Sequence, residues 1–458
     1  MSKIKKIVLI GAGSAVFTQG LIADFILTKD LGEWEIALVD INLTALKSIT
    51  ALANKMVEDR GPHIRITSTI DRREVLRDAD FVVTTIAVGG RRGWENDVFI
   101  PRKYGVYQPV GDTTMAGGIS RAMRMIPTMI DIANDVKELC PNAYFFNYSN
   151  PMSAVTKAVR EATGVKVIGL CHGILYVENY LAKFVNTKYE NIKALGIGIN
   201  HITFLYNFTV NGKDGWKLVD EEIARQRKSM KEHGHEYNFF NPMLEDKEIP
   251  KFADNPFSWS LYEKYGALPA VLDRHVVEFF PERFKSGEYY GHKLGIDAFP
   301  FESVIERGDK TYEKMVENAE SPEVNEELFT RLNGEHEQLT EMIRSLLLDG
   351  RKIFHVNVPN HGAVPNLPYN AVLELPAVAT NRGFYPMHIE DYPEKLAAII
   401  RRRASVIDIT VQAALTGDRL LMEEALLLDG CVTDEETAKN LTNDLLEAHK
   451  EYLPQFNK

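Results

Sequence analysis

Short apolar runs alternate with amphipathic stretches through the first 170 residues. Residues 7–10 form a continuous apolar run, typical of a parallel strand buried on both faces, and residues 16–27 follow with helical spacing. The same order recurs, and further strands are predicted over residues 35–39, 81–86, 143–148 and 166–170. Alternating strands and helices are typical of a doubly wound parallel sheet. We therefore expect an α/β, Rossmann-like domain over residues 1–190.

The pattern changes near residue 191. Residues 194–199 and 201–210 alternate as two strands around Asn200, and polar and helical segments follow them. The longest stretches with helical spacing span residues 326–348 and 396–415. We expect residues 191–458 to form a second, α+β lobe that supplies substrate contacts and oligomer contacts.

Composition narrows the class of protein. The 458 residues are 45% hydrophobic and 26% charged, as in an ordinary globular protein, and no apolar run reaches the roughly 18 residues of a membrane helix. A net charge of −11 argues against a nucleic-acid surface. The three cysteines, Cys140, Cys171 and Cys431, are too few and too scattered for a disulfide framework. We expect a cytoplasmic protein with no membrane or nucleic-acid partner.

A glycine-rich loop follows the first predicted strand. Gly11 and Gly13, with Ser14 after them, let the backbone turn tightly and approach a pyrophosphate at a helix start. Asp40 closes the second predicted strand, where a carboxylate accepts hydrogen bonds from an adenosine ribose and repels a 2′-phosphate. Val16 occupies the third glycine position of the fingerprint. The loop favours NAD as cofactor, and the alternative is a glycine turn in a domain that binds no nucleotide.

Two residues are candidate metal ligands. Cys171 stands at the carboxyl end of a predicted parallel strand, and His201 stands at a strand junction. A thiolate and an imidazole suit a divalent transition metal. Spacing alone favours a buried thiol and a core histidine instead, because two residues so far apart define no local metal cage.

A series of motifs in a fixed order resembles the family-4 glycoside hydrolases, which use NAD and a divalent metal, commonly manganese. That family is an exception to the two-carboxylate pattern of most glycosidases. The resemblance rests on Gly11-Ala12-Gly13-Ser14, Val88-Gly89-Gly90, Tyr104-Gly105, Gly111-Asp112, Gly117-Gly118, Asn147-Tyr148-Ser149-Asn150-Pro151, Gly169-Leu170-Cys171-His172-Gly173, Gly198-Ile199-Asn200-His201 and Val358-Pro359-Asn360-His361-Gly362.

The resemblance implies roles around the metal. Cys171 and His201 become the metal ligands, which reverses the preference given by spacing. Asp112 matches an acidic position near the metal site and is a candidate catalytic group. Asn150 is expected to contact the sugar hydroxyls.

The resemblance also implies an acid and a base. The residue after the metal cysteine supplies the acid for the leaving group in some relatives as aspartate, and here that residue is His172. The base lies on a loop after a Tyr-Gly pair, and in this chain the pair Tyr265-Gly266 leads to Asp273. Some relatives use tyrosine as the base.

Two differences from the relatives that act on phosphorylated sugars, and one further motif, indicate the class of substrate. Relatives that act on 6-phosphosugars resemble one another in an arginine after the Val-Gly-Gly motif and in Cys-Asn at the metal strand. Trp94 and His172 replace those residues here, which favours an unphosphorylated glycoside. Arg274 and His275 resemble the α-galacturonidase branch and are expected to contact the substrate, because a guanidinium can bind a sugar carboxylate in a bidentate manner. We therefore favour an α-galacturonide as the substrate. Two alternatives stay open: Arg274 instead braces a loop by pairing with Glu278, or the substrate is an α-galactoside or an α-glucoside.

The implied reaction passes through an oxidised sugar. NAD takes hydride from C3, a base removes the C2 proton, the group at C1 leaves, water adds and the hydride returns. Two other functions stay open: a 2-hydroxyacid dehydrogenase of the lactate/malate type, and an NAD-binding regulator without activity. The expected partners are a small sugar and further copies of the chain, as a homo-dimer or homo-tetramer.

Overall fold

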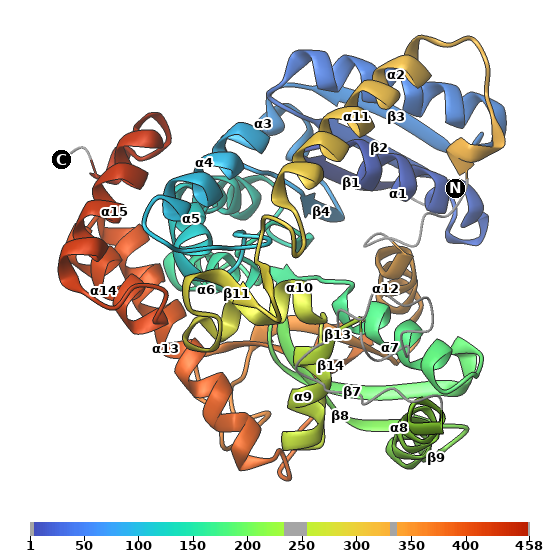
Figure 1. Ribbon diagram of the computed structural model, residues 1–458. Helices are drawn as coiled ribbons and strands as arrows, with labels where there is room; N and C mark the ends of the chain where they lie inside the picture. The colour runs from blue at the N-terminus through green and yellow to red at the C-terminus, as the bar shows by residue number, and fades with distance from the viewer. Residues whose placement is uncertain (1–3, 233–253, 330–336, 457–458) are drawn as a thin grey trace.

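The computed structural model describes residues 4–232, 254–329 and 337–456 (Figure 1). Six strands from the first half of the chain form a parallel sheet in the order β6-β5-β4-β1-β2-β3. This order confirms the expected doubly wound sheet. Their bounds are β1 (Lys5–Ile10), β2 (Trp34–Val39), β3 (Ile64–Thr69), β4 (Phe81–Thr84), β5 (Tyr144–Asn147) and β6 (Ile168–Gly169).

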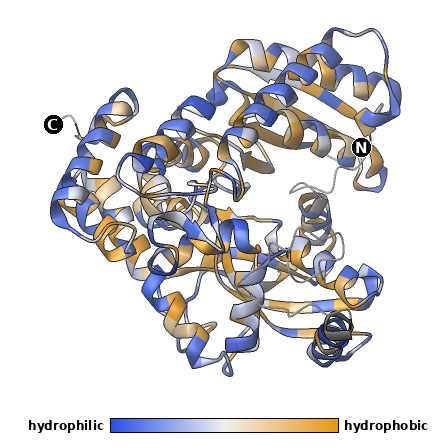
Figure 2. Ribbon diagram, in the orientation of Figure 1, coloured by the Kyte–Doolittle hydropathy of each residue, from blue (hydrophilic) through white to orange (hydrophobic). Residues whose placement is uncertain are grey.

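Alternate residues of the central strand β1 enter two separate cores. Ile7 and Leu9 pack with the helices α1 (Ala15–Leu27) and α2 (Leu43–Arg60). Val8 and Ile10 belong to the core that contains α3 (Arg72–Leu76), α5 (Met115–Leu139) and α6 (Met152–Thr163). The continuous apolar run thus reflects a strand covered by helices on both faces. Figure 2 shows the hydrophobic residues concentrated in the strands and on the inner sides of the helices.

The second half of the chain extends the same sheet with antiparallel strands. β13 pairs with β6 where Asn357 lies opposite Gly169, and the order continues β13-β14-β7-β8-β10. The bounds are β7 (Ile192–Ile199), β8 (Ile202–Val210), β9 (Lys213–Asp214), β10 (Leu268–Ala270), β13 (Lys352–Pro359), β14 (Val372–Thr380) and β15 (Gly383–Pro386), and β11 (Glu288–Tyr289) pairs with β12 (His292–Lys293) separately.

Helices from the second half return to the first half. α11 (Phe301–Glu320) packs on α2, and α13 (Glu394–Thr416) packs on α5 (Figure 1). The division at residue 190 stays a prediction, because the described parts of both halves share one sheet and several helix contacts. The remaining helices are α4 (Gly90–Arg102), α7 (Gly173–Phe184), α8 (Gly215–Glu232), α9 (Pro256–Tyr265), α10 (Asp273–Val276), α12 (Glu337–Leu348), α14 (Arg419–Asp429) and α15 (Glu435–Ala448). Among the described helices, none combines the length and the apolar character that crossing a bilayer requires.

Candidate active site and metal centre

The glycine loop lies at the carboxyl end of β1. Gly11 has φ +92°, and a Cβ added there would lie 2.8 Å from the backbone carbon of Thr85. A Cβ at Gly13 would lie 2.7 Å from Oδ2 of Asp40. Ser14 occupies the N-cap position of α1, so the loop opens directly into the helix start. These close approaches require glycine, and the loop fits the cradle for a pyrophosphate.

Asp40 closes β2 beside this loop. Its Oδ2 accepts a hydrogen bond from the Gly13 N–H at 2.7 Å, and its Oδ1 accepts one from the Asn42 N–H at 2.8 Å. The carboxylate therefore fixes the turn while its side chain is partly exposed at the sheet edge. That position is the one expected for a group that binds a ribose.

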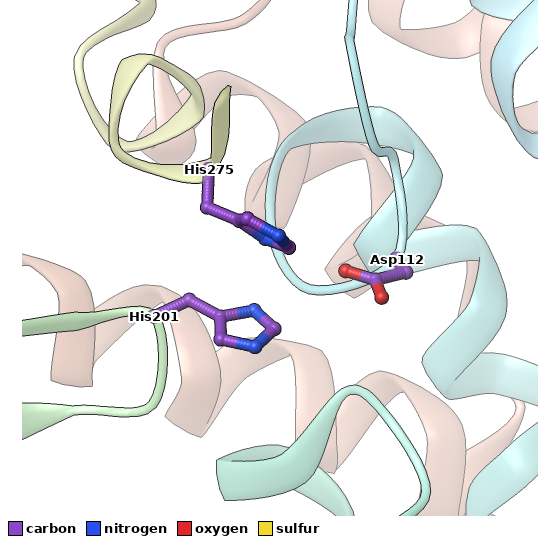
Figure 3. Close-up of side chains that lie close together, drawn as sticks. All are labelled: Asp112, His201 and His275. Atoms are coloured by element: carbon purple, nitrogen blue, oxygen red, sulfur yellow. The ribbon is translucent and has the colours of Figure 1, made fainter. Parts of the chain in front are cut away.

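Three side chains from distant parts of the chain meet at one point (Figure 3). Asp112 comes from the loop before α5, His201 from the turn between β7 and β8, and His275 from α10. One ligand atom from each lies within 4.8 Å of the others. The two imidazole rings have centroids 4.3 Å apart. Two imidazoles and a carboxylate fit a divalent first-row metal ion.

Burial and neighbouring charges shift the pKa values of two members of this cluster. Burial disfavours ionisation of Asp112, but His201, His275 and Arg121 outweigh burial and hold the pKa of this carboxyl below its ordinary value. Burial, with His201 next, moves the pKa of His275 well below its ordinary value. A neutral imidazole can donate a lone pair to a metal ion, so this environment prepares His275 as a ligand.

Hydrogen bonds fix the orientation of two members. Thr113 Oγ1 lies 2.8 Å from Nδ1 of His201 and donates to Asp112 Oδ1 at 2.7 Å. Asn150 donates through Nδ2 to Asp112 Oδ2 at 2.9 Å. The Oδ1 atom of Asn150 is buried and has no hydrogen-bond partner in the described part of the chain, so it can accept a hydrogen bond from a ligand hydroxyl.

Cys171 and His172 follow β6 at the same edge of the sheet. The Gly173 N–H donates to Sγ of Cys171 at 3.4 Å, and His172 occupies the N-cap position of α7. The described group of three metal-type ligands contains His201 but not Cys171. His172 lies near enough to His275 to contribute to the lowered pKa of that residue. The pairing of Cys171 with His201 stays a prediction.

Asp273 is fully buried at the start of α10. Its carboxylate accepts hydrogen bonds from the N–H groups of Phe257 and Ser258, at 2.8 and 2.6 Å, and from the Tyr289 hydroxyl at 2.6 Å. Burial raises the pKa of this carboxyl despite these donors. The contacts hold the first turn of α9 in place, so Asp273 has a structural task as well as the predicted role of base.

Arg274 lies on α10 and is partly buried. Its Nε is buried with no hydrogen-bond partner among the described residues, and burial and then Arg307 lower its pKa. The described ion pairs include none between Arg274 and Glu278; the Glu278 carboxylate instead accepts N–H groups of the loop before Asp112. Arg274 is therefore available for an anionic ligand group.

Sequence reasoning did not find Arg121 or Arg307. Arg121 lies on α5, donates through Nε to the Asn150 carbonyl at 3.2 Å and stands over the ring of Trp94 at 6.0 Å. Trp94 itself donates to the Val110 carbonyl at 2.7 Å. Arg121 shares the mainly apolar first half of α5 with a second arginine, Arg124, so the sequence does not single it out. No local pattern distinguishes Arg307 in the charged helix α11.

Comparison with known proteins places these features in a family. Residues 6–187 match the family 4 glycosyl hydrolase model, and residues 196–432 match the C-terminal domain of family 4 glycosyl hydrolases. An alpha-galactosidase of Bacillus subtilis is 30% identical over 99% of this chain and 100% of its own length. An alpha-galacturonidase of Thermoanaerobacterium saccharolyticum is 30% identical over 98% of this chain and 96% of its own length.

A solved structure shares the fold. The 6-phospho-beta glucosidase of Thermotoga maritima, solved with manganese, NAD+ and glucose-6-phosphate, superposes with a TM-score of 0.77 at 24% identity, over 98% of this chain and 99% of that chain. This likeness shows a common fold. The matched family models together cover most of the sequence, including the glycine loop and all three clustered ligands. The chain belongs to the family 4 glycosyl hydrolases.

Proposed function

We propose that this chain hydrolyses an unphosphorylated α-glycoside, with an α-galacturonide as the preferred substrate, and that it works with NAD and a divalent metal ion such as Mn²⁺. The observation that carries the proposal is the cluster of Asp112, His201 and His275 at the carboxyl edge of a sheet whose first loop is a dinucleotide cradle. Family membership favours a glycosidase over a dehydrogenase or a silent regulator.

The cofactor groups have defined places. Gly11, Gly13, Ser14 and Asp40 would hold NAD. Asp112, His201 and His275 would hold the metal ion, with Cys171 as a further ligand. When bound, NAD accepts hydride from the sugar and the metal ion stabilises negative charge on the sugar oxygens.

The residues of the chain supply the proton transfers. The Asp273 carboxylate removes the proton at C2, and His172 donates a proton to the departing glycosidic oxygen. Asn150 orients a sugar hydroxyl through its buried Oδ1 atom. Asp112 fixes Asn150 through the 2.9 Å hydrogen bond.

The preference for a uronide rests on Arg274. Its guanidinium is partly buried beside Arg307, and the described ion pairs give neither arginine a carboxylate partner. A sugar carboxylate could accept bidentate hydrogen bonds from Arg274 and would offset one of the two positive charges. The alpha-galacturonidase among the relatives supports this substrate class.

A substrate panel tests the proposal. Nitrophenyl α-galacturonide, α-glucuronide, α-galactoside, α-glucoside and their available 6-phosphates are compared with NAD, Mn²⁺ and reductant present. We expect the highest kcat/KM for the α-galacturonide and no accumulation of NADH. Arg274→Lys should lower kcat/KM for the uronide by about 10-fold or more, as expected for a lost bidentate contact, and spare the α-galactoside. Preference for a phosphorylated sugar, or one NADH per turnover, would contradict the proposal.

Location and assembly belong to the same proposal. We place the enzyme in the cytoplasm, where reducing conditions keep Cys171 available as a ligand. We expect a homo-dimer or homo-tetramer, since most oligomers of soluble proteins are symmetric copies of one chain. Light scattering of the purified chain measures the assembly directly.

A further inference from the structure

Glu278 is a buried carboxylate that the proposed reaction does not use. It lies in the short 3-10 helix Val277–Phe279, directly after α10, and is only 2% exposed. Its Oε1 atom accepts hydrogen bonds from the N–H groups of Val110 and Gly111, at 2.7 and 2.9 Å. Burial raises the pKa of this carboxyl to about 8, although the two N–H groups lower it. A buried polar group of this kind persists only when its hydrogen bonds serve the fold or a site.

Both partners in this contact lie close in sequence to members of the cluster of Asp112, His201 and His275. Glu278 follows His275 by one helical turn, and Gly111 directly precedes Asp112. One carboxylate oxygen therefore joins the two chain segments that deliver His275 and Asp112. Without this oxygen, two adjacent N–H groups in a buried loop would lose their acceptor.

The loop held by Glu278 has little freedom to adopt another shape. Gly111 has φ +65°, and a Cβ there would lie 2.6 Å from Cγ2 of Val98. On the far side of Asp112, the Thr114 hydroxyl donates to Asp429 at 3.0 Å. The loop is thus fixed at both ends, and Glu278 provides the end nearest to His275.

We propose that Glu278 is a positioning residue for the metal centre: by accepting the two loop N–H groups it sets the distance between Asp112 and His275 and so the affinity for a divalent cation. This inference rests on the proposed function, because it takes the cluster to be a metal site. Removal of a residue that holds metal ligands in place typically lowers metal affinity by about 10–100-fold.

The test compares Glu278→Ala and Glu278→Gln with Asp434→Ala as the matched control. Asp434 also accepts a backbone N–H, that of Thr437 at 2.8 Å, but it caps α15 on the surface. We expect Glu278→Ala to weaken Mn²⁺ binding, followed by the electron paramagnetic resonance signal of free Mn²⁺, by about 10–100-fold. Glu278→Gln should bind nearly as the wild type, because an amide oxygen can accept both N–H groups.

Two further measurements separate positioning from general damage. Hydrogen exchange of residues 108–114 in the metal-free protein should accelerate in Glu278→Ala and not in Glu278→Gln, while NAD affinity stays unchanged in both. If Glu278→Ala does not fold, Glu278→Asp, one methylene shorter, takes its place with the same expectation. Wild-type Mn²⁺ affinity in Glu278→Ala or in Glu278→Asp would overturn the inference. Absence of Mn²⁺ binding by the wild type would instead remove the metal site itself, and with it the task of Glu278.

Discussion

Gly13 shows how one missing side chain shapes the cofactor loop. An alanine Cβ there would lie 2.7 Å from Oδ2 of Asp40 and 2.8 Å from Cβ of Ala45, both closer than real contacts allow. We expect Gly13→Ala to weaken NAD binding by about 10-fold or more and to cost roughly 1–3 kcal/mol of stability, because the loop must shift. Fluorescence titration with NADH and urea unfolding measure the two effects.

A matched glycine provides the control for this substitution. Gly308 lies inside α11, where an added Cβ would meet only the flexible side chain of Arg91, at 3.1 Å. Gly308→Ala should keep NAD affinity and change stability by about 1 kcal/mol or less. Equal NAD affinity in both variants would show that the loop does not contact the cofactor.

Asp273 has an observed structural contact with α9 and the proposed role of base, and substitution can separate the two. Asp273→Asn keeps an acceptor oxygen for one of the two α9 N–H groups but cannot remove a proton, so we expect kcat to fall by about 100-fold or more with NAD and Mn²⁺ binding preserved. Asp273→Ala should in addition lose stability, because the N–H groups of Phe257 and Ser258 become unpaired, at about 1–3 kcal/mol for each. If Asp273→Asn kept a near-normal kcat, Asp273 would not be the base, and its role would be structural only.

Part of the candidate site could be proposed from the sequence for clear reasons. Gly11, Gly13 and Asp40 are visible because strand, loop and helix follow one another along the chain. Asp112 and His275 lie far apart in sequence, and no spacing rule relates one to the other. Their contact depends on how α10 approaches the loop before α5, which only the three-dimensional structure shows.

At the scale of elements, the parallel strands were predictable and the assembly of the second half was not. The buried strands β1, β2 and β5 each fall within about two residues of their predicted bounds, because burial on both faces gives continuous apolar runs. The predicted helix over residues 326–348 appears in part as α12, with residues 330–336 outside the described part of the chain. The joining of β13 to β6 depends on pairing between residues almost 190 positions apart. No local pattern encodes such a pairing.

The contact between α13 and α14 contains a buried ion pair. Arg403 donates through Nη1 to Oδ2 of Asp429 at 2.8 Å, and both side chains are almost fully buried. Asp429→Ala would leave the guanidinium without its carboxylate, so we expect a loss of about 3–5 kcal/mol in the free energy of unfolding. Urea unfolding measures this loss.

A surface pair serves as the comparison. Lys450 and Glu447 lie 2.6 Å apart with 67% and 73% of their side chains exposed. Glu447→Ala should therefore change stability by about 1 kcal/mol or less. A similar loss in the two variants would mean that burial of the Arg403–Asp429 pair does not increase its contribution to the free energy of unfolding.

At the scale of the whole molecule, buried carboxyls connect stability to pH. Glu374 lies in β14, only 2% exposed, and burial raises its pKa from 4.5 to about 7 although the Thr203 hydroxyl donates to it. Between these two pKa values the folded chain holds a proton that the unfolded chain has released. The contribution of protonated Glu374 to stability is thus fully present below pH 4.5 and is lost as pH rises from there through 7.

Glu374→Gln removes this titration while keeping the size of the side chain and an oxygen that can accept from Thr203. The variant should gain stability relative to the wild type on going from pH 5 to pH 8, by at most about 3 kcal/mol, the value of the pKa difference. Urea unfolding of both proteins at the two pH values gives this difference, and every group that titrates equally in both proteins cancels. A stability difference that is the same at pH 5 and pH 8 would show that Glu374 is ionised in the folded chain throughout, with water or a cation reaching the interior of the sheet.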